Sequence, residues 1–247
     1  MNLDGFSQGD SPLHHLDPRM KIVAYLPLAV LTALIDSFFQ VLLALTAALI
    51  LAGTARIFSR LLLQRLAVVN MFMAFLWLTL PYSVSGEPLL WQAGALSPSI
   101  EGTALSLLLT LKTNAIALYT VSLPGTSTVM SLSHAMLHLR FPRKLVTIFY
   151  FFYRYTGVIS REFSTMQRML KARAFHATSN LHTVRVYGYF TGILFIRSIE
   201  RAERVYHALV MRNFTGEFPL LFHFNARGND IAFLCLMAVV ILTIAFL

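Results

Sequence analysis

The stretch Ile22–Ala55 has the sequence IVAYLPLAVLTALIDSFFQVLLALTAALILAGTA and is almost wholly apolar. A helix that spans a membrane needs roughly 20 mostly apolar residues, so this stretch is too long for a single span. Asp36 and Ser37 interrupt it near its middle. We therefore predict two helices in a tight hairpin, over about 20–36 and 38–55, with the first rather short.

Three further apolar stretches have the length of single spans, at about 66–82, 103–123 and 231–247. The whole chain is 57% hydrophobic and only 13% charged, whereas ordinary soluble domains are near a quarter charged. The sequence thus predicts an all-α, polytopic membrane helical bundle with about five transmembrane helices.

The basic residues are concentrated in one part of the chain. Fourteen of the 20 Lys and Arg residues lie between Arg140 and Arg227, against four acidic residues there. The short loop 56–65 is also basic, whereas the loop 83–101 contains Glu87 and Glu101 and no Lys or Arg. Because basic loops stay on the cytoplasmic side, we expect a multi-pass cell-membrane protein whose N-terminus and residues 124–228 are cytoplasmic. The same rule explains the isoelectric point near 10.1, so we expect no nucleic-acid partner.

This pattern divides the chain into three parts. Residues 1–123 form an N-terminal membrane bundle of about four transmembrane helices, 124–228 a basic cytoplasmic helical domain, and 229–247 a C-terminal transmembrane helix. Within the cytoplasmic domain, caps and prolines predict helices over about 126–140, 142–174 and 183–212.

Motifs for catalysis or cofactor binding are missing from the sequence. No glycine directly precedes a lysine, as a phosphate-binding loop requires, and the few acidic residues are scattered. His134 and His138 are four residues apart but have no third metal ligand near them in sequence. We expect a non-catalytic chain that binds no cofactor and no metal; if ATP drives it, another chain binds the ATP.

Two arginines lie near predicted helix ends, in Ala172-Arg173-Ala174 and Met211-Arg212-Asn213. Asn213 suits a C-terminal cap because asparagine adopts the left-handed backbone conformation readily. One interpretation is that both arginines complement the helix dipole. The other is that both present a rigid guanidinium fork to carboxylates of a partner. The residues alone weigh these equally.

A rival function rests on Lys112 and Asn114 within the fourth span, together with Asp36. Charged and polar groups at such depth face the protein interior or a cavity, as in the pathway of a stand-alone secondary transporter. A second rival is a membrane-anchored protein that binds RNA or lipid through the basic domain.

Several motifs resemble those of one transporter family. Ser11–Lys21 (SPLHHLDPRMK) resembles the N-terminal motif of the transmembrane T components of energy-coupling factor transporters. Arg197–Tyr206 (RSIERAERVY) is similar to the third-helix signature of their CbiQ branch, which serves cobalt and nickel uptake. Leu123–Thr126 (LPGT) and Tyr153–Tyr155 (YRY) fit that branch as well.

The resemblance implies a scaffold that couples a substrate-binding membrane subunit to two cytoplasmic ABC-type ATPases. Two coupling helices of that family end in Ala-Arg-Gly-like motifs that sit in grooves of the ATPases. The positions here are Ala172, Arg173, Ala174, Met211, Arg212 and Asn213. Both glycines are replaced, by Ala174 and Asn213, and the second alanine is Met211; both arginines are present.

We therefore expect the energy-coupling subunit of an importer for cobalt or nickel ions. A CbiM-like substrate-binding (S) component and a small CbiN-like subunit would accompany the ATPases, and lipid would surround the spans. Helical spacing predicts that one face of the third cytoplasmic helix packs the coupling helices together. That face carries Ile199, Ala202, Val205 and Leu209. A stand-alone secondary transporter and a T component for a vitamin are the alternatives.

Overall fold

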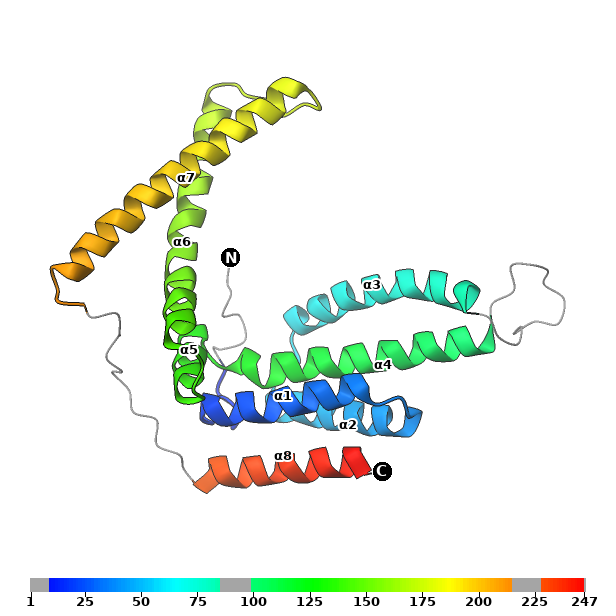
Figure 1. Cartoon of the computed structure of the whole chain (residues 1–247). Helices are drawn as coiled ribbons and strands as arrows, with labels where there is room; N and C mark the ends of the chain where they lie inside the picture. The colour runs from blue at the N-terminus through cyan, green and yellow to red at the C-terminus, as the bar shows by residue number, and fades with distance from the viewer. Residues whose placement is uncertain (1–8, 85–98, 215–227, 247) are drawn as a thin grey trace. The chain divides into compact units, whose positions relative to one another are not determined.

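The computed structural model describes residues 9–84, 99–214 and 228–246, and every regular element in these ranges is helical (Figure 1). The helices are α1 (Pro18–Leu34), α2 (Phe38–Thr54), α3 (Arg60–Ser83), α4 (Ile100–Ser122), the short 3₁₀ helix η1 (Pro124–Thr126), α5 (Val129–His138), α6 (Arg143–Ala172), α7 (Leu181–Val210) and α8 (Gly228–Phe246). The all-helical prediction is confirmed. Most of the loop 83–101 lies outside the described residues.

The chain divides into two compact units. The first, the membrane unit, comprises Met1–Ala135 and His223–Leu247, and the second, the hairpin unit, comprises Met136–Phe222. Helix α5 begins in the first unit and ends in the second, and the membrane boundary expected at residue 123 stays a prediction.

Among the described residues, three helical segments are long and apolar enough to cross a membrane: α3, α4 with η1, and α8. The chain is thus a multi-pass membrane protein. α2 is apolar but has 17 residues, as does α1, which also contains Pro27. At 1.5 Å per residue each extends about 25 Å, slightly less than a typical hydrocarbon core. That α1 and α2 each cross the whole membrane stays a prediction.

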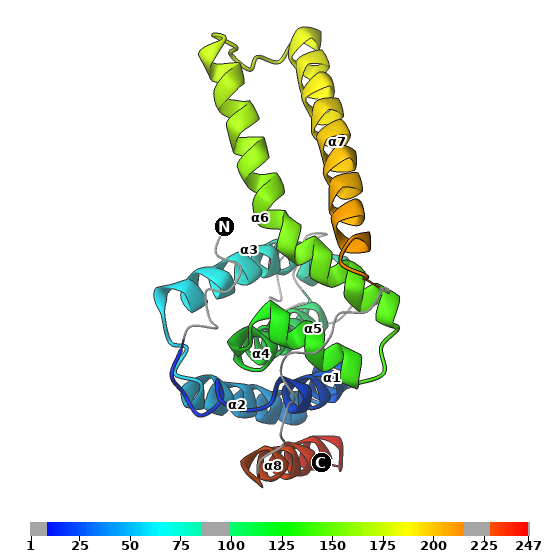
Figure 2. The same cartoon turned by 90° about the vertical axis from the view of Figure 1, so that its left-hand side faces the viewer.

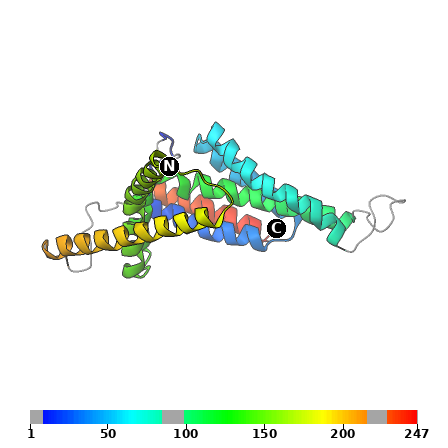
Figure 3. The same ribbon diagram turned by 90° about the horizontal axis from the view of Figure 1, so that it is seen from above.

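α4 lies at the centre of the membrane unit, in contact with α1, α2 and α3 (Figures 1 and 3). The buried Tyr119 hydroxyl donates a 2.6 Å hydrogen bond to the carbonyl of Ala44 on α2. On the side towards α3, the amides of Asn114 and Asn70 bond each other reciprocally, at 2.9 and 3.0 Å. These hydrogen bonds offset the free-energy cost of burying polar groups in apolar surroundings.

The close approach of α3 and α4 requires a glycine. Ser99 caps α4, since its hydroxyl accepts a hydrogen bond from the Gly102 amide and donates one to the Pro81 carbonyl. A methyl group added at Gly102 would lie 2.7 Å from the Leu80 carbonyl oxygen and 2.8 Å from the Pro81 Cα atom. Both are backbone atoms of α3, so no side-chain rotation relieves the clash.

The hairpin unit consists mainly of two 30-residue helices, α6 and α7, joined by residues 173–180 (Figure 2). α6 begins directly after Pro142, as expected from the fixed backbone angle of proline. The expected helices over 142–174 and 183–212 agree with α6 and α7 to within about two residues, the ordinary uncertainty of helix ends.

Gly102→Ala tests the packing of α3 on α4. Forcing the two backbones apart should destabilise the detergent-solubilised protein by roughly 1–3 kcal/mol, seen as a lower thermal midpoint. The matched control is Gly188→Ala on α7, where nothing lies within 4 Å of the added methyl group. The control should be neutral or slightly stabilising, because alanine favours helix more than glycine does. Equal midpoints for the two variants would contradict the packing.

Candidate functional site

The two long helices of the hairpin unit end in the same way. Each ends in the pattern Leu-x-x-Arg-x-Phe, over Leu170–Phe175 at the end of α6 and Leu209–Phe214 at the end of α7. In both, the residue after the arginine has a positive φ angle and the phenylalanine turns back towards the leucine. This backbone arrangement is a Schellman motif, which satisfies carbonyls that a helix end leaves without partners.

At the end of α6, Ala174 has a φ of 53°. The Ala174 amide bonds the Lys171 carbonyl at 3.0 Å, and the Phe175 amide bonds the Leu170 carbonyl at 3.1 Å. Arg173 occupies the cap position immediately before the turn.

At the end of α7, Asn213 has a φ of 58°. Its amide bonds the Val210 carbonyl at 2.9 Å, and the Phe214 amide bonds the Leu209 carbonyl at 3.0 Å. Arg212 therefore stands at the position that Arg173 has on α6. The left-handed conformation that the sequence suggested for Asn213 is present.

The arginines at these two ends, Arg173 and Arg212, are both exposed. Within the described residues, neither guanidinium group has a hydrogen-bond or ion-pair partner. Ala172, Ala174, Met211 and Asn213 beside them are also exposed, Met211 to 88%. Each end thus presents one free, rigid donor fork beside small or flexible neighbours, a geometry suited to a carboxylate on another molecule. The favourable interaction with the helix dipole remains available to both arginines as well.

Between these two ends, α6 and α7 are connected by one carboxylate. Glu162 on α6 accepts hydrogen bonds from Arg197 at 2.8 Å and from Arg201 at 2.7 Å, both on α7. Phe163 and Phe190 pack edge to face beside it, with ring centroids 5.2 Å apart. The two hydrogen bonds from Arg197 and Arg201 hold the pKa of Glu162 below its ordinary value of 4.5. No pattern in the sequence indicates this contact, although Glu162 is the only acidic residue of α6.

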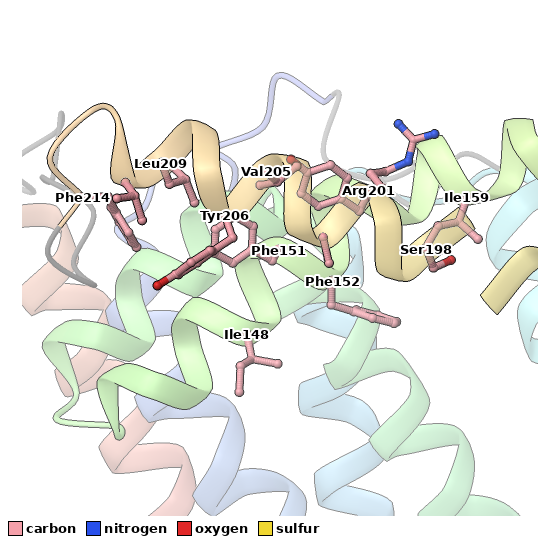
Figure 4. Close-up of a pocket in the computed structure, with 13 residues that line it drawn as sticks. Ile148, Phe151, Phe152, Ile159, Ser198, Arg201, Val205, Tyr206, Leu209 and Phe214 are labelled. Carbon is pink, nitrogen blue, oxygen red and sulfur yellow. The ribbon is translucent and has the colours of Figure 1, made fainter. Parts of the chain in front are cut away.

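An open, mainly apolar groove of about 660 Å³ lies between α6 and α7 (Figure 4). Its lining comes from both helices and from the turn after α7: Ile148, Phe151, Phe152, Tyr155, Ile159, Ser198, Arg201, Ala202, Val205, Tyr206, Leu209, Val210 and Phe214. Three of the four residues expected to pack the helices together, Ala202, Val205 and Leu209, line this groove. The fourth, Ile199, is not part of the lining and is 58% exposed.

Two of the three residues of the rival transport pathway, Lys112 and Asp36, contact each other, whereas the third, Asn114, lies apart from them. Lys112 donates to the Asp36 carboxylate at 3.1 Å and to the Ala33 carbonyl at 3.2 Å. Asn114 bonds Asn70 instead. Two residues further along a helix is about 200° of rotation, so Lys112 and Asn114 serve opposite faces of α4.

Comparison with known proteins gives a family and one distant relative. The family model described as CbiQ, cobalt transport protein, matches residues 9–224. An uncharacterised protein of Methanocaldococcus jannaschii is 25% identical over 139 residues, which are 56% of this chain and 48% of the relative. The matched part thus spans about half the length of that relative.

Acidification should loosen the hairpin through Glu162. Because its pKa is lowered in the folded state, its contribution to stability is complete above the unfolded pKa. That contribution is lost as the pH falls through the folded value. Amide hydrogen exchange around residues 160–166 and 194–201 should therefore accelerate below pH 4.5. Glu162→Gln should show faster exchange already at pH 7, with little further change on acidification. Glu203→Gln, on the exposed side of α7, is the control and should behave as wild type.

The strain at the two helix ends is unequal. Alanine in the left-handed region costs roughly 1–2 kcal/mol, which glycine avoids and asparagine largely avoids. Ala174→Gly should therefore slow amide exchange over the last turn of α6, corresponding to about 1 kcal/mol, while Asn213→Gly should change the end of α7 less. Faster exchange at α6 in Ala174→Gly would contradict the assigned backbone conformation.

Proposed function

Because this chain belongs to the CbiQ family of cobalt transport proteins, we propose that it is the energy-coupling subunit of an ATP-driven importer. In this proposal it is the T component of an energy-coupling factor transporter for cobalt or nickel ions. It connects two cytoplasmic ABC-type ATPases to a CbiM-like substrate-binding membrane subunit, with a small CbiN-like subunit as a further partner. The chain itself hydrolyses no ATP and holds no resident cofactor.

The observation that carries the proposal is the pair of equivalent arginine ends. Arg173 and Arg212 follow long helices, have the same backbone environment and lack partners among the described residues. The resemblance implies glycine at positions 174 and 213, and these positions have positive φ angles. The left-handed backbone conformation that glycine favours is therefore present at both positions, although the residues are alanine and asparagine. We infer that each end inserts its guanidinium group into a groove of one ATPase and pairs with a carboxylate.

The charge distribution supports the proposed orientation. The stretch Arg140–Arg227 has a large basic excess, and basic segments stay on the cytoplasmic side, where the ATPases would be. In this proposal, each exposed guanidinium group attaches the chain to an ATPase. The apolar groove between α6 and α7 remains available to other subunits of the complex.

A stand-alone transporter has less support. Two of its proposed pathway residues, Lys112 and Asp36, bond each other, while the third, Asn114, bonds Asn70 on the opposite face of α4. Such contacts stabilise helix packing in a membrane and need no solute.

Substitution of the two arginines tests the proposal. Removing one member of a desolvated charge pair costs roughly 2–5 kcal/mol, so Arg173→Ala and Arg212→Ala should each weaken ATPase binding. The double variant should lose co-purification of the ATPase and Co²⁺ uptake, because two linked contacts reinforce each other.

The matched control is Arg168→Ala, an exposed arginine on α6 that lies five residues before Arg173. It should keep wild-type co-purification and uptake. Intact ATPase binding and uptake in the double variant would refute the coupling role of the arginines.

A further inference from the structure

The turn between α1 and α2 is bonded to the middle of α4. Lys112 of α4 donates to the Asp36 carboxylate at 3.1 Å and to the Ala33 carbonyl at 3.2 Å. Lys112 lies roughly half-way between Ile100 and Ser122, the first and last residues of α4. At 1.5 Å per residue, about 18 Å of α4 separates Lys112 from Ile100. The turn therefore lies near the middle of α4, well short of its Ile100 end (Figure 1).

Helix α3, in contrast, accompanies α4 as far as the Ile100 end. Asn70 and Asn114 bond each other near the middle of the two helices, and at their far ends the Ser99 hydroxyl donates to the Pro81 carbonyl at 3.2 Å. Both α3 and α4 with η1 are long and apolar enough to cross a membrane. The α1–α2 hairpin is thus shorter than the span that α3 and α4 form, and its turn lies near the middle of that span.

One face of α4 changes from buried to exposed where the hairpin ends. Lys112, Ala115 and Tyr119 follow one another at helical spacing on this face, and all three are buried. The same face continues towards Ile100 with Leu108, which is half-buried, and Leu105, which is 40% exposed. The hairpin therefore covers this face on one side of Lys112 and leaves it open on the other.

The carboxylate at the turn is exposed at this depth. The Asp36 side chain is 94% exposed, whereas that of Lys112 is 9% exposed. The neighbouring Leu34 and Phe38 are 73% and 50% exposed. Lipid tails cover apolar side chains but give a carboxylate no hydrogen bond, and charged groups inside a membrane face protein or a water-filled cavity. Because a carboxylate accepts more hydrogen bonds than the one from Lys112, an apolar helix with one donor side chain would satisfy every group here.

We propose that the α1–α2 hairpin is re-entrant and that its turn receives a transmembrane helix of a partner, which donates a hydrogen bond to Asp36. This inference rests on the proposed function, in which the partner is the substrate-binding membrane subunit. The partner's helix packs on Leu105 and Leu108 of α4 and on Leu34 and Phe38 of the hairpin. A re-entrant hairpin returns to the side on which it began, so residues 56–65 stay on the same side as the N-terminus.

The first test replaces the ion pair by apolar residues. Asp36→Leu with Lys112→Met leaves no charge unpaired, so the chain should still fold. The matched control, Asn70→Leu with Asn114→Leu, removes the polar pair between α3 and α4. Each variant is co-expressed with the ATPases and the substrate-binding membrane subunit, and the complex is purified through a tag on this chain.

The Asp36 and Lys112 variant should recover about tenfold less of the membrane subunit, the loss expected from one hydrogen bond to a charged group, and the usual amount of ATPase. The control should recover both as wild type does. Undiminished recovery of the membrane subunit would overturn the inference. A parallel loss of membrane subunit and ATPase would overturn it as well, because that result indicates stability alone.

The second test measures depth and contact at the turn in membranes that contain the assembled complex. Ser37→Cys, in a chain that also carries Cys235→Ser, should not react with a membrane-impermeant maleimide. The control Ser83→Cys, at the exposed last residue of α3, should react. Equal labelling of the two positions would place the turn at an aqueous surface or cavity and would overturn the inference.

A photoreactive residue at position 34 leaves the ion pair intact and identifies what covers the turn. It should capture the substrate-binding membrane subunit; capture of lipid alone, or of the small subunit alone, would overturn the proposed occupant. Failure of the proposed function is recognised separately, because the wild-type chain would then recover no ATPase. In that case the maleimide reaction still decides the re-entrant part: labelling at position 37 overturns it, and protection supports it.

Discussion

The packing of neighbouring helices against α4 is the constraint on which the membrane unit depends. α1, α2 and α3 all contact α4, and α8 packs in turn on α1 and α2. Among apolar surroundings this association relies on small residues and internal hydrogen bonds, since lipid competes equally for apolar contact. Gly102 lets the α3 backbone approach, and Tyr119 supplies a hydrogen bond to a carbonyl of α2. The position of α4 then determines where Thr126 lies, because η1 begins two residues after α4 ends.

Much of this architecture was predictable because it follows from local patterns. The interruption at Asp36 and Ser37 predicts the turn between α1 and α2, and Pro142 predicts the start of α6. Long-range pairing was not predictable in the same way. The bond from Lys21 to Ser127 and the contact of Glu162 with two arginines join residues distant in sequence, and no periodicity indicates which partners meet. The short lengths of α1 and α2 show that apolar composition alone leaves the number of complete spans open.

The candidate site was partly visible in the sequence. The arginines at positions 173 and 212 were identified from their places near helix ends, and Asn213 from its tolerance of positive φ. The sequence also contains the repeated Leu-x-x-Arg-x-Phe pattern. The pattern alone does not indicate that both helices end in a Schellman motif, which is recognised by its backbone hydrogen bonds. The face of α7 illustrates the limit of helical spacing. Ala202, Val205 and Leu209 line the groove towards α6, whereas Ile199 is not part of that lining and is 58% exposed.

The central claim is that both helix ends bind ATP-hydrolysing subunits, and site-specific photocrosslinking in native membranes tests it most directly. A photoreactive residue is introduced beside each arginine, at position 172 or at position 211, and a third is introduced as a control at Val239, which is 60% exposed on α8. The account predicts capture of the ATPase from positions 172 and 211 and none from position 239. Capture from neither helix end, with the assembled complex intact, would contradict it.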